Sequence, residues 1–153
     1  MKLKAFIIFA FIIIFSTAAY SQADREVSKY LQKVAQGDIS EVKMKLPDLL
    51  AEYPDHPGVM LLHGAVIEDA FRALDIYKKI VDEYDDSQWA DDAYWRIIQF
   101  YAIQGDTTRA QINYMKLKQN YPASEFLGPA SDVVRSSIAL ARSSKEKKSF
   151  TAS

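Results

Sequence analysis

Apolar residues recur at helical spacing along nearly the whole chain after residue 24. Neighbouring apolar positions lie mostly three or four residues apart, which places each group on one face of a helix. No stretch shows the alternation of apolar and polar residues that is typical of strands as clearly as the chain shows helical spacing. The spacing therefore predicts an all-α fold with helices of about 12–16 residues. The predicted faces are Val27, Tyr30, Leu31 and Val34; Val42, Leu46, Leu49 and Leu50; Ala73, Leu74, Tyr77, Ile80, Val81 and Tyr84; Tyr94, Ile97, Ile98 and Tyr101; Ala110, Tyr114, Leu117 and Tyr121; and Val133, Val134, Ile138 and Ala141.

Residues that end or begin helices lie between these faces. Gly37-Asp38 and Gly105-Asp106 each combine a glycine that can close one helix with an aspartate that can cap the next. Pro54 and Pro122 each follow a tyrosine and cannot continue a helix. The boundaries of the predicted helices therefore agree with the apolar spacing.

Three stretches of the chain are similar to one another. Each has a turn, an apolar face, a closing tyrosine and a second turn, over residues 37–54, 68–85 and 105–122. The closing tyrosines Tyr53, Tyr84 and Tyr121 are 31 and 37 residues apart. Self-similarity at such a period indicates stacked helix pairs, each burying its apolar face against the next.

The clearest copy spans residues 91–122. It has large and apolar residues in its first helix, then a glycine turn, an alanine, and a closing proline; the residues are Tyr94, Ile97, Ile98, Tyr101, Gly105, Ala110, Tyr114, Leu117 and Pro122. In this pattern the chain resembles the tetratricopeptide repeats of bacterial envelope proteins, although Ile98 replaces a small residue. The junction over residues 84–93 is similar to one in the soluble coordinator of the Tol–Pal system and in the β-barrel assembly lipoprotein. The resemblance implies a tetratricopeptide-type α-solenoid of about three helix pairs plus a C-terminal capping helix.

The first residues have the three parts of a secretory signal. A basic start precedes the apolar run over residues 5–15, and small residues follow it. Cleavage between Ser21 and Gln22 and a periplasmic or secreted location are expected. A membrane anchor is the alternative, but spanning a bilayer takes about 20 apolar residues. The sequence has no cysteine. We therefore expect no cysteine-linked lipid anchor, no disulfide and no thiolate metal site.

These patterns divide the chain into three parts. We expect a cleaved signal peptide over residues 1–21, a tetratricopeptide-repeat domain over residues 22–141 and a disordered basic tail over residues 142–153. The acidic residues lie almost wholly in the second part. Because the net charge is -1 and no basic face is evident, nucleic acid is not an expected partner.

One face of the helix after residue 90 is the candidate binding site. Asp92, Trp95, Gln99 and Ala102 are spaced three or four residues apart. The resemblance implies that these positions line a concave groove. A tryptophan among polar groups is typical of a binding hot spot. The alternative is that Trp95 packs against the neighbouring copy.

Residue patterns for catalysis are missing from the sequence. No nucleophile motif, phosphate-binding glycine loop or zinc-binding His-Glu-x-x-His occurs. His56 and His63 are separated by Pro57, so we interpret them as a turn and a helix-surface histidine rather than a metal pair. Acidic residues over 82–92 lack the spacing of a calcium loop, and Asp91 and Asp92 suit the start of a helix. We therefore expect no enzyme, no cofactor and no metal.

The sequence favours an exported, noncatalytic scaffold of the cell envelope that holds a partner protein or peptide in its groove. The alternative is a structural subunit of an outer-membrane or peptidoglycan-associated assembly. That subunit would dock through its convex face or through the basic tail.

Overall fold

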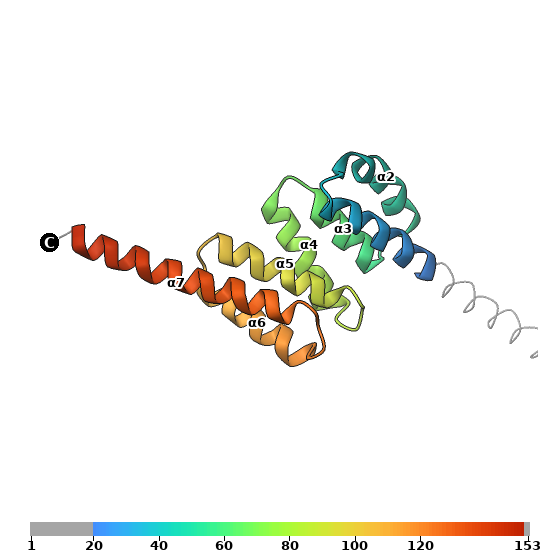
Figure 1. Cartoon of the computed structure of the whole chain (residues 1–153). Coiled ribbons are helices and arrows are strands. Elements are labelled where there is room, and N and C mark those ends of the chain that lie inside the picture. The colour runs from blue at the N-terminus through green and yellow to red at the C-terminus, as the bar shows by residue number, and fades with distance from the viewer. Residues whose placement is uncertain (1–19, 152–153) are drawn as a thin grey trace, which may run out of the picture. The chain divides into compact units, whose positions relative to one another are not determined.

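The computed structural model describes residues 20–151, without the side chains of residues 145, 146 and 148–151. Between residues 20 and 151 there are seven helices and no strand, which confirms the predicted all-α class. A helix over residues 20–35 comes first. It is followed by α2 (Ile39–Glu52), α3 (Pro57–Val66), α4 (Ala70–Glu83), α5 (Ala90–Ile103), α6 (Thr107–Asn120) and α7 (Leu127–Thr151) (Figure 1).

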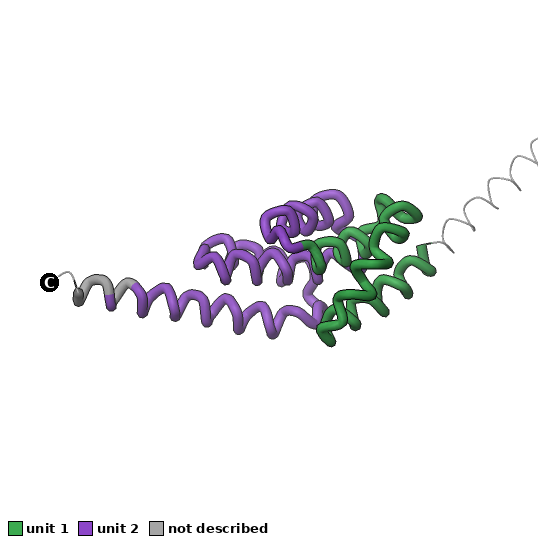
Figure 2. The backbone as a smooth tube through the Cα atoms, turned by 90° about the horizontal axis from the view of Figure 1, so that it is seen from above, with its two compact units in different colours: residues 1–67 green, residues 68–153 purple. Residues whose placement is uncertain are grey.

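The chain forms two compact units where the sequence predicted one repeat domain over residues 22–141. Unit 1 ends at Ile67 and unit 2 begins at Glu68, at the start of the second of the three similar stretches, residues 68–85 (Figure 2). In unit 1, α2 packs against α3. In unit 2, α5 packs against α4, α6 and α7, and α6 packs against α7. Neighbouring helices thus pack in sequence order within each unit, which is compatible with an α-solenoid.

The predicted apolar faces supply most of the core. Val27, Val42, Ile80, Ile97 and Leu117 each have at most 1% of their surface exposed. The agreement is weakest in α6, where only Ala110 and Leu117 are buried. The face predicted there included Tyr114 and Tyr121, which are half-buried.

The three aligned tyrosines occupy equivalent positions at helix ends. Tyr53, Tyr84 and Tyr121 are the C-caps of α2, α4 and α6, and each of these helices has 14 residues. In each case the tyrosine N–H donates to the carbonyl four residues earlier. The similarity that the sequence shows over residues 37–54, 68–85 and 105–122 is therefore also a similarity of local structure.

The predicted glycine turns are present. Gly37 and Gly105 have φ angles of 83° and 73°, in the left-handed region where an L side chain is strained. Asp106 then caps α6 by accepting a hydrogen bond from the N–H of Arg109 at 2.9 Å. Asp38 stands at the start of α2, but its side chain makes no capping hydrogen bond.

Residues 142–151 continue α7 in the structure, where we expected a disordered tail. Serine was read as a sign of disorder, but a serine hydroxyl can also bond back to the preceding helical turn. The hydroxyls of Ser143 and Ser144 both donate to the carbonyl of Leu140. Lysine, arginine and glutamate, which fill much of the remainder, are good helix formers.

The predicted signal peptide lies mostly outside the described residues, because these start at residue 20. Tyr20 and Ser21, just before the predicted cleavage site, belong to the first described helix. Of the helices between residues 20 and 151, none combines the length and the apolar character that crossing a bilayer requires.

Candidate functional site

The predicted groove residues lie on the side of α5 that is only partly covered. The opposite, buried side consists of Ala93, Tyr94, Ile97, Ile98 and Tyr101, together with Ala90. Asp92, Trp95, Gln99 and Ala102 all have intermediate exposure. The predicted core face of the helix is therefore buried, and the four predicted groove residues lie outside it.

Trp95 both packs against a neighbouring segment and keeps part of its surface exposed. Its ring stacks on that of Phe126, with centroids 6.4 Å apart and planes 13° apart. Phe126 lies immediately before α7. The two alternatives for Trp95, packing and exposure in a groove, therefore describe different parts of one side chain.

A shallow cleft of about 410 Å³ lies between α5 and α7. The exposed surface in the cleft is mainly apolar, and two of its residues, Ile103 and Leu140, are 83% and 68% exposed. Large apolar side chains in such positions are typical of binding surfaces when they are contiguous. The cleft is lined by Ala102, Ile103, Asp132, Val133, Ser136, Ser137 and Leu140.

The cleft continues the face that carries Trp95. Ala102 lies seven positions after Trp95 on α5, and Val133 lies seven positions after Phe126 at α7. Trp95 meets Phe126, and Ala102 shares the cleft with Val133. The two helices are therefore parallel, and residues the same number of positions along each helix lie opposite one another. We call this surface, from the Trp95–Phe126 pair to Leu140, the α5–α7 groove.

Asp92 lies at the start of α5 and is largely covered. Its carboxylate is 14% exposed and accepts a hydrogen bond from Arg96 Nε at 3.0 Å. Burial raises the pKa of Asp92, and the Arg96 guanidinium opposes that shift. Asp91 and Glu125 raise the pKa further, which indicates that several carboxylates gather at this end of the groove. As predicted, Asp91 and Asp92 occupy the first turn of the helix.

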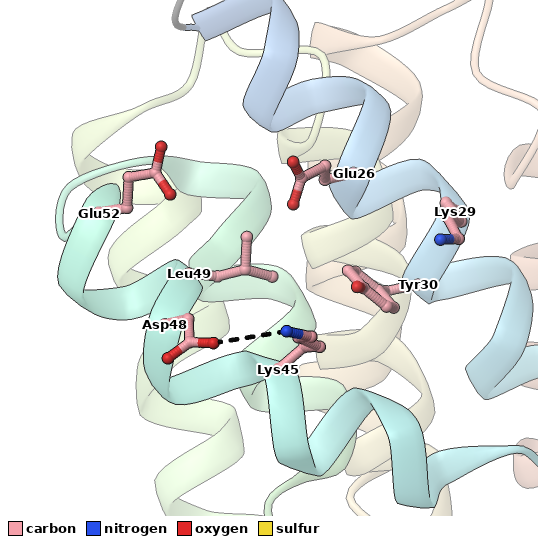
Figure 3. Close-up of a pocket in the computed structure, with 7 residues that line it drawn as sticks. All are labelled: Glu26, Lys29, Tyr30, Lys45, Asp48, Leu49 and Glu52. Carbon is pink, nitrogen blue, oxygen red and sulfur yellow. Dashed lines mark ion pairs between the residues drawn. The ribbon is translucent and has the colours of Figure 1, made fainter.

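Unit 1 has a different depression, of about 350 Å³, between its first helix and α2 (Figure 3). In Figure 3 the ring of Tyr30 and the side chain of Leu49 lie between charged groups of both signs. Lys45 and Asp48 form an exposed ion pair at 3.7 Å across one turn of α2. The lining consists of Glu26, Lys29, Tyr30, Lys45, Asp48, Leu49 and Glu52. None of these residues was predicted as a site from the sequence.

The two histidines have separate roles. His56 precedes α3, and its Nδ1 accepts a hydrogen bond from the N–H of Gly58 at 3.2 Å, while His63 lies in the last turn of the same helix. His56 lies in the turn before α3, as predicted, and its side chain is 2% exposed and caps that helix. Within residues 20–151 no three histidine, cysteine, aspartate or glutamate side chains are grouped so that they could hold a metal ion.

Sequence reasoning missed the two most exposed apolar residues of the groove. Ile103 and Leu140 lie outside the predicted apolar stripes of their helices. Their place outside these faces was the signal that could have identified them. A large apolar residue outside the core face is not buried against its own helix pair, so it can contact another partner. Their proximity depends on the alignment of α5 with α7, which the sequence alone does not show.

The fold and the groove define an all-α protein with neighbouring helices packed in order and an exposed apolar cleft between two parallel helices. The chain matches no protein-family model, no curated protein and no solved structure with which it was compared.

Proposed function

We propose that this chain is an exported, noncatalytic scaffold of the tetratricopeptide-repeat type, whose α5–α7 groove holds a partner protein or peptide in the cell envelope. The proposal rests on one observation above all, the exposure of Ile103 and Leu140 beside a cleft of about 410 Å³. Covering such side chains removes apolar surface from water at about 25 cal/mol per Å².

The repeated local structure supports the proposed repeat type. Three 14-residue helices end at equivalent tyrosines, and neighbouring helices pack in sequence order. The basic start, apolar run and small residues at the beginning of the chain support export.

Capture of partners from envelope extract tests the groove. We expect Ile103→Ser with Leu140→Ser to lose the captured partner, because the double substitution removes the exposed apolar contacts without opening the core. The matched control is Ile112→Ser with Met115→Ser on α6, where the two side chains are 52% and 56% exposed. Equal recovery by wild type and the folded groove variant would contradict the assignment.

A second proposal, docking as a subunit of an outer-membrane or peptidoglycan-associated assembly, is favoured by a different surface. Ile112 and Met115 border a shallow depression of about 420 Å³ on α6, and α7 extends beyond α5 and α6 (Figures 1 and 2). In that case the α6 variant, or removal of residues 142–153, would lose association while the groove variant retained it. Salt-sensitive sedimentation with peptidoglycan would assign the docking to the basic end of α7.

A further inference from the structure

The end of the α5–α7 groove at the Trp95–Phe126 pair is acidic. Asp91 lies four positions before Trp95 on α5, and Glu125 directly precedes Phe126. Burial raises the pKa of Asp92, and the charges of Asp91 and Glu125 raise it further, so both lie close to it. Asp92 is already in an ion pair, but the ion pairs of the described side chains include neither Asp91 nor Glu125. These two carboxylates are therefore available to a cation on a partner.

The turn before α5 adds further carboxylates to this end. The Tyr121 hydroxyl donates a hydrogen bond to the backbone carbonyl of Asp85 at 2.5 Å, so the turn lies beside the segment between α6 and α7. Burial raises the pKa of Tyr121 to about 12, and the charges of Asp85 and Asp86 contribute to the rise. Both aspartates are exposed. We call the carboxylates of Asp85, Asp86, Asp91 and Glu125 the acidic end of the groove.

No basic residue belongs to the segments that form this end. Residues 80–95 and 119–134 include several aspartates and glutamates, but no lysine or arginine before position 96 or 135. Among the described residues that line the cleft, Asp132 alone is charged, and it forms an ion pair with Arg135. The charge along the groove that is not paired within the protein is therefore negative, and a partner of complementary charge is basic.

The apolar cleft lies next to the acidic end. Ala102 lines the cleft seven positions after Trp95, which is about 10 Å along a helix at 1.5 Å per residue. Ile103 and Leu140, the two most exposed apolar side chains of the groove, lie in the cleft as well. A ligand that complements both parts therefore has basic side chains next to an apolar stretch.

We propose that the α5–α7 groove binds a partner segment in which a cluster of lysines or arginines adjoins an apolar stretch. The basic cluster lies at the acidic end, and the apolar stretch covers Ile103 and Leu140. This inference rests on the proposed groove function and adds the chemistry of the partner and its placement along the groove. The apolar stretch provides most of the affinity, and the basic cluster selects among apolar segments. The two parts are centred about seven residues apart if the segment is helical, or about three if it is extended.

Three synthetic peptides that differ at one end test the charge preference. All share a stretch of leucine, alanine and glutamine, and the variable end carries four lysines, four serines or four glutamates. We expect the intact protein to bind the lysine peptide about tenfold more tightly than the serine peptide, since several exposed ion pairs each contribute little. The glutamate peptide should bind more weakly than the serine peptide, and both differences should shrink at high salt.

A pair of variants tests where the preference arises. Asp91→Asn with Glu125→Gln removes two charges from the acidic end and should reduce the preference for the lysine peptide to about threefold or less. Its affinity for the serine peptide should stay the same, because the apolar cleft is intact. The matched control is Asp55→Asn with Asp75→Asn, which removes the same charge at two exposed positions that are not groove residues. The control should keep the full preference.

A photoreactive group on the lysine peptide tests the placement. At the lysine end it should label residues 84–95 or 121–126, and at the opposite end of the peptide it should label residues 132–144. Mass spectrometry of the digested protein locates the labels. Circular dichroism of each variant is the folding control.

The results separate this inference from the proposal on which it rests. Equal affinity for the lysine and serine peptides, an equal loss of preference in the control variant, a lysine-end label within residues 132–144, or no binding of the lysine peptide would each overturn the inference. The groove function fails on other grounds, when Ile103→Ser with Leu140→Ser leaves capture of the envelope partner unchanged.

Discussion

The side chains that cap helix starts by hydrogen bonds differ in chemistry between the two units. In unit 1, α3 starts at His56, whose ring nitrogen accepts a backbone hydrogen bond. In unit 2, α4 and α6 start at Asp69 and Asp106, whose carboxylates accept theirs. An imidazole changes charge near pH 6.5. The cap of α3 therefore depends on the charge state of an imidazole, whereas the caps of α4 and α6 are carboxylates.

The surroundings of His56 explain why its protonation is unfavourable. Because Nδ1 accepts from Gly58, the proton of the neutral ring is on Nε2, which lies 3.3 Å from Asp24 Oδ1. The rings of Tyr20 and Tyr53 lie against the imidazole. Burial lowers the pKa of His56, and the Asp24 carboxylate and the backbone at Tyr20 offset only part of that shift.

The largest expected effect is that of His56→Ala in unit 1. The substitution removes a helix cap and a ring that is 2% exposed, so we expect a loss of about 2 kcal/mol in the free energy of unfolding at pH 7.5. Urea unfolding followed by circular dichroism measures the loss. Hydrogen exchange at the Gly58 amide then locates it at the start of α3. His63→Ala, in the same helix, is the control, and an equal loss there would contradict the special role of His56.

The next prediction concerns pH. The pKa of His56 is lower in the folded chain than in the unfolded chain, so unfolding takes up a proton between the two values. The contribution of His56 to stability is full above about pH 6.5 and declines as the pH falls below it. Exchange at Gly58 should therefore accelerate between pH 7 and 5, after correction for the intrinsic rate.

His56→Asn is the control for that titration, because asparagine can cap a helix but does not titrate in this range. We expect its stability to be flat between pH 7 and 5. Protection of the Arg72 and Arg109 amides, which bond to the aspartate caps of unit 2, should be flat in both proteins. If the stability of His56→Asn declined between pH 7 and 5 as much as that of wild type, the acid response would belong to another group.

A smaller effect is expected from the carboxylate caps of unit 2. Asp106→Ala removes the hydrogen bond to the Arg109 N–H and should cost about 1 kcal/mol, seen as faster exchange at the start of α6. Asp38→Ala is a matched control, because Asp38 precedes α2 without a capping hydrogen bond. Equal losses would mean that the capping contact contributes nothing measurable.

The sequence alone predicted the elements better than their assembly. Helical spacing identified buried residues such as Ile97 and Leu117, because the core face of an amphipathic helix is a local property. The aligned tyrosines were recognisable for the same reason, since each closes its own helix. Local periodicity does not reveal a boundary between units, and the division at Ile67 was missed.

The candidate site shows the same limit. Asp92 and Trp95 were placed on one face of α5, apart from the core face, because helical geometry relates them directly. That this face lines a groove was implied by the resemblance. Leu140 was missed because its place in the groove depends on the packing of α7 beside α5. The burial of His56 was missed because it lies against Asp24, a residue far away in the sequence.

The smallest expected effect is that of Asp92→Asn in unit 2. Asparagine keeps the size of the side chain and an acceptor oxygen for Arg96. The lost attraction is offset because a largely covered carboxylate no longer has to be ionised away from water. We expect the stability at pH 7 to change by no more than about 0.5 kcal/mol.

The pH dependence gives the sign of this small difference. Because the pKa of Asp92 is raised in the folded chain, ionisation of Asp92 disfavours folding, and wild type gains stability relative to Asp92→Asn as the pH falls towards 4. Chemical unfolding of both proteins at pH 7 and pH 4 measures the difference. A marked loss for Asp92→Asn at pH 7 that vanishes in an Arg96→Gln background would instead show a strong ion pair. The acid response of unit 2 would then begin with the breaking of that pair, and the contrast with His56 in unit 1 would no longer rest on helix caps alone.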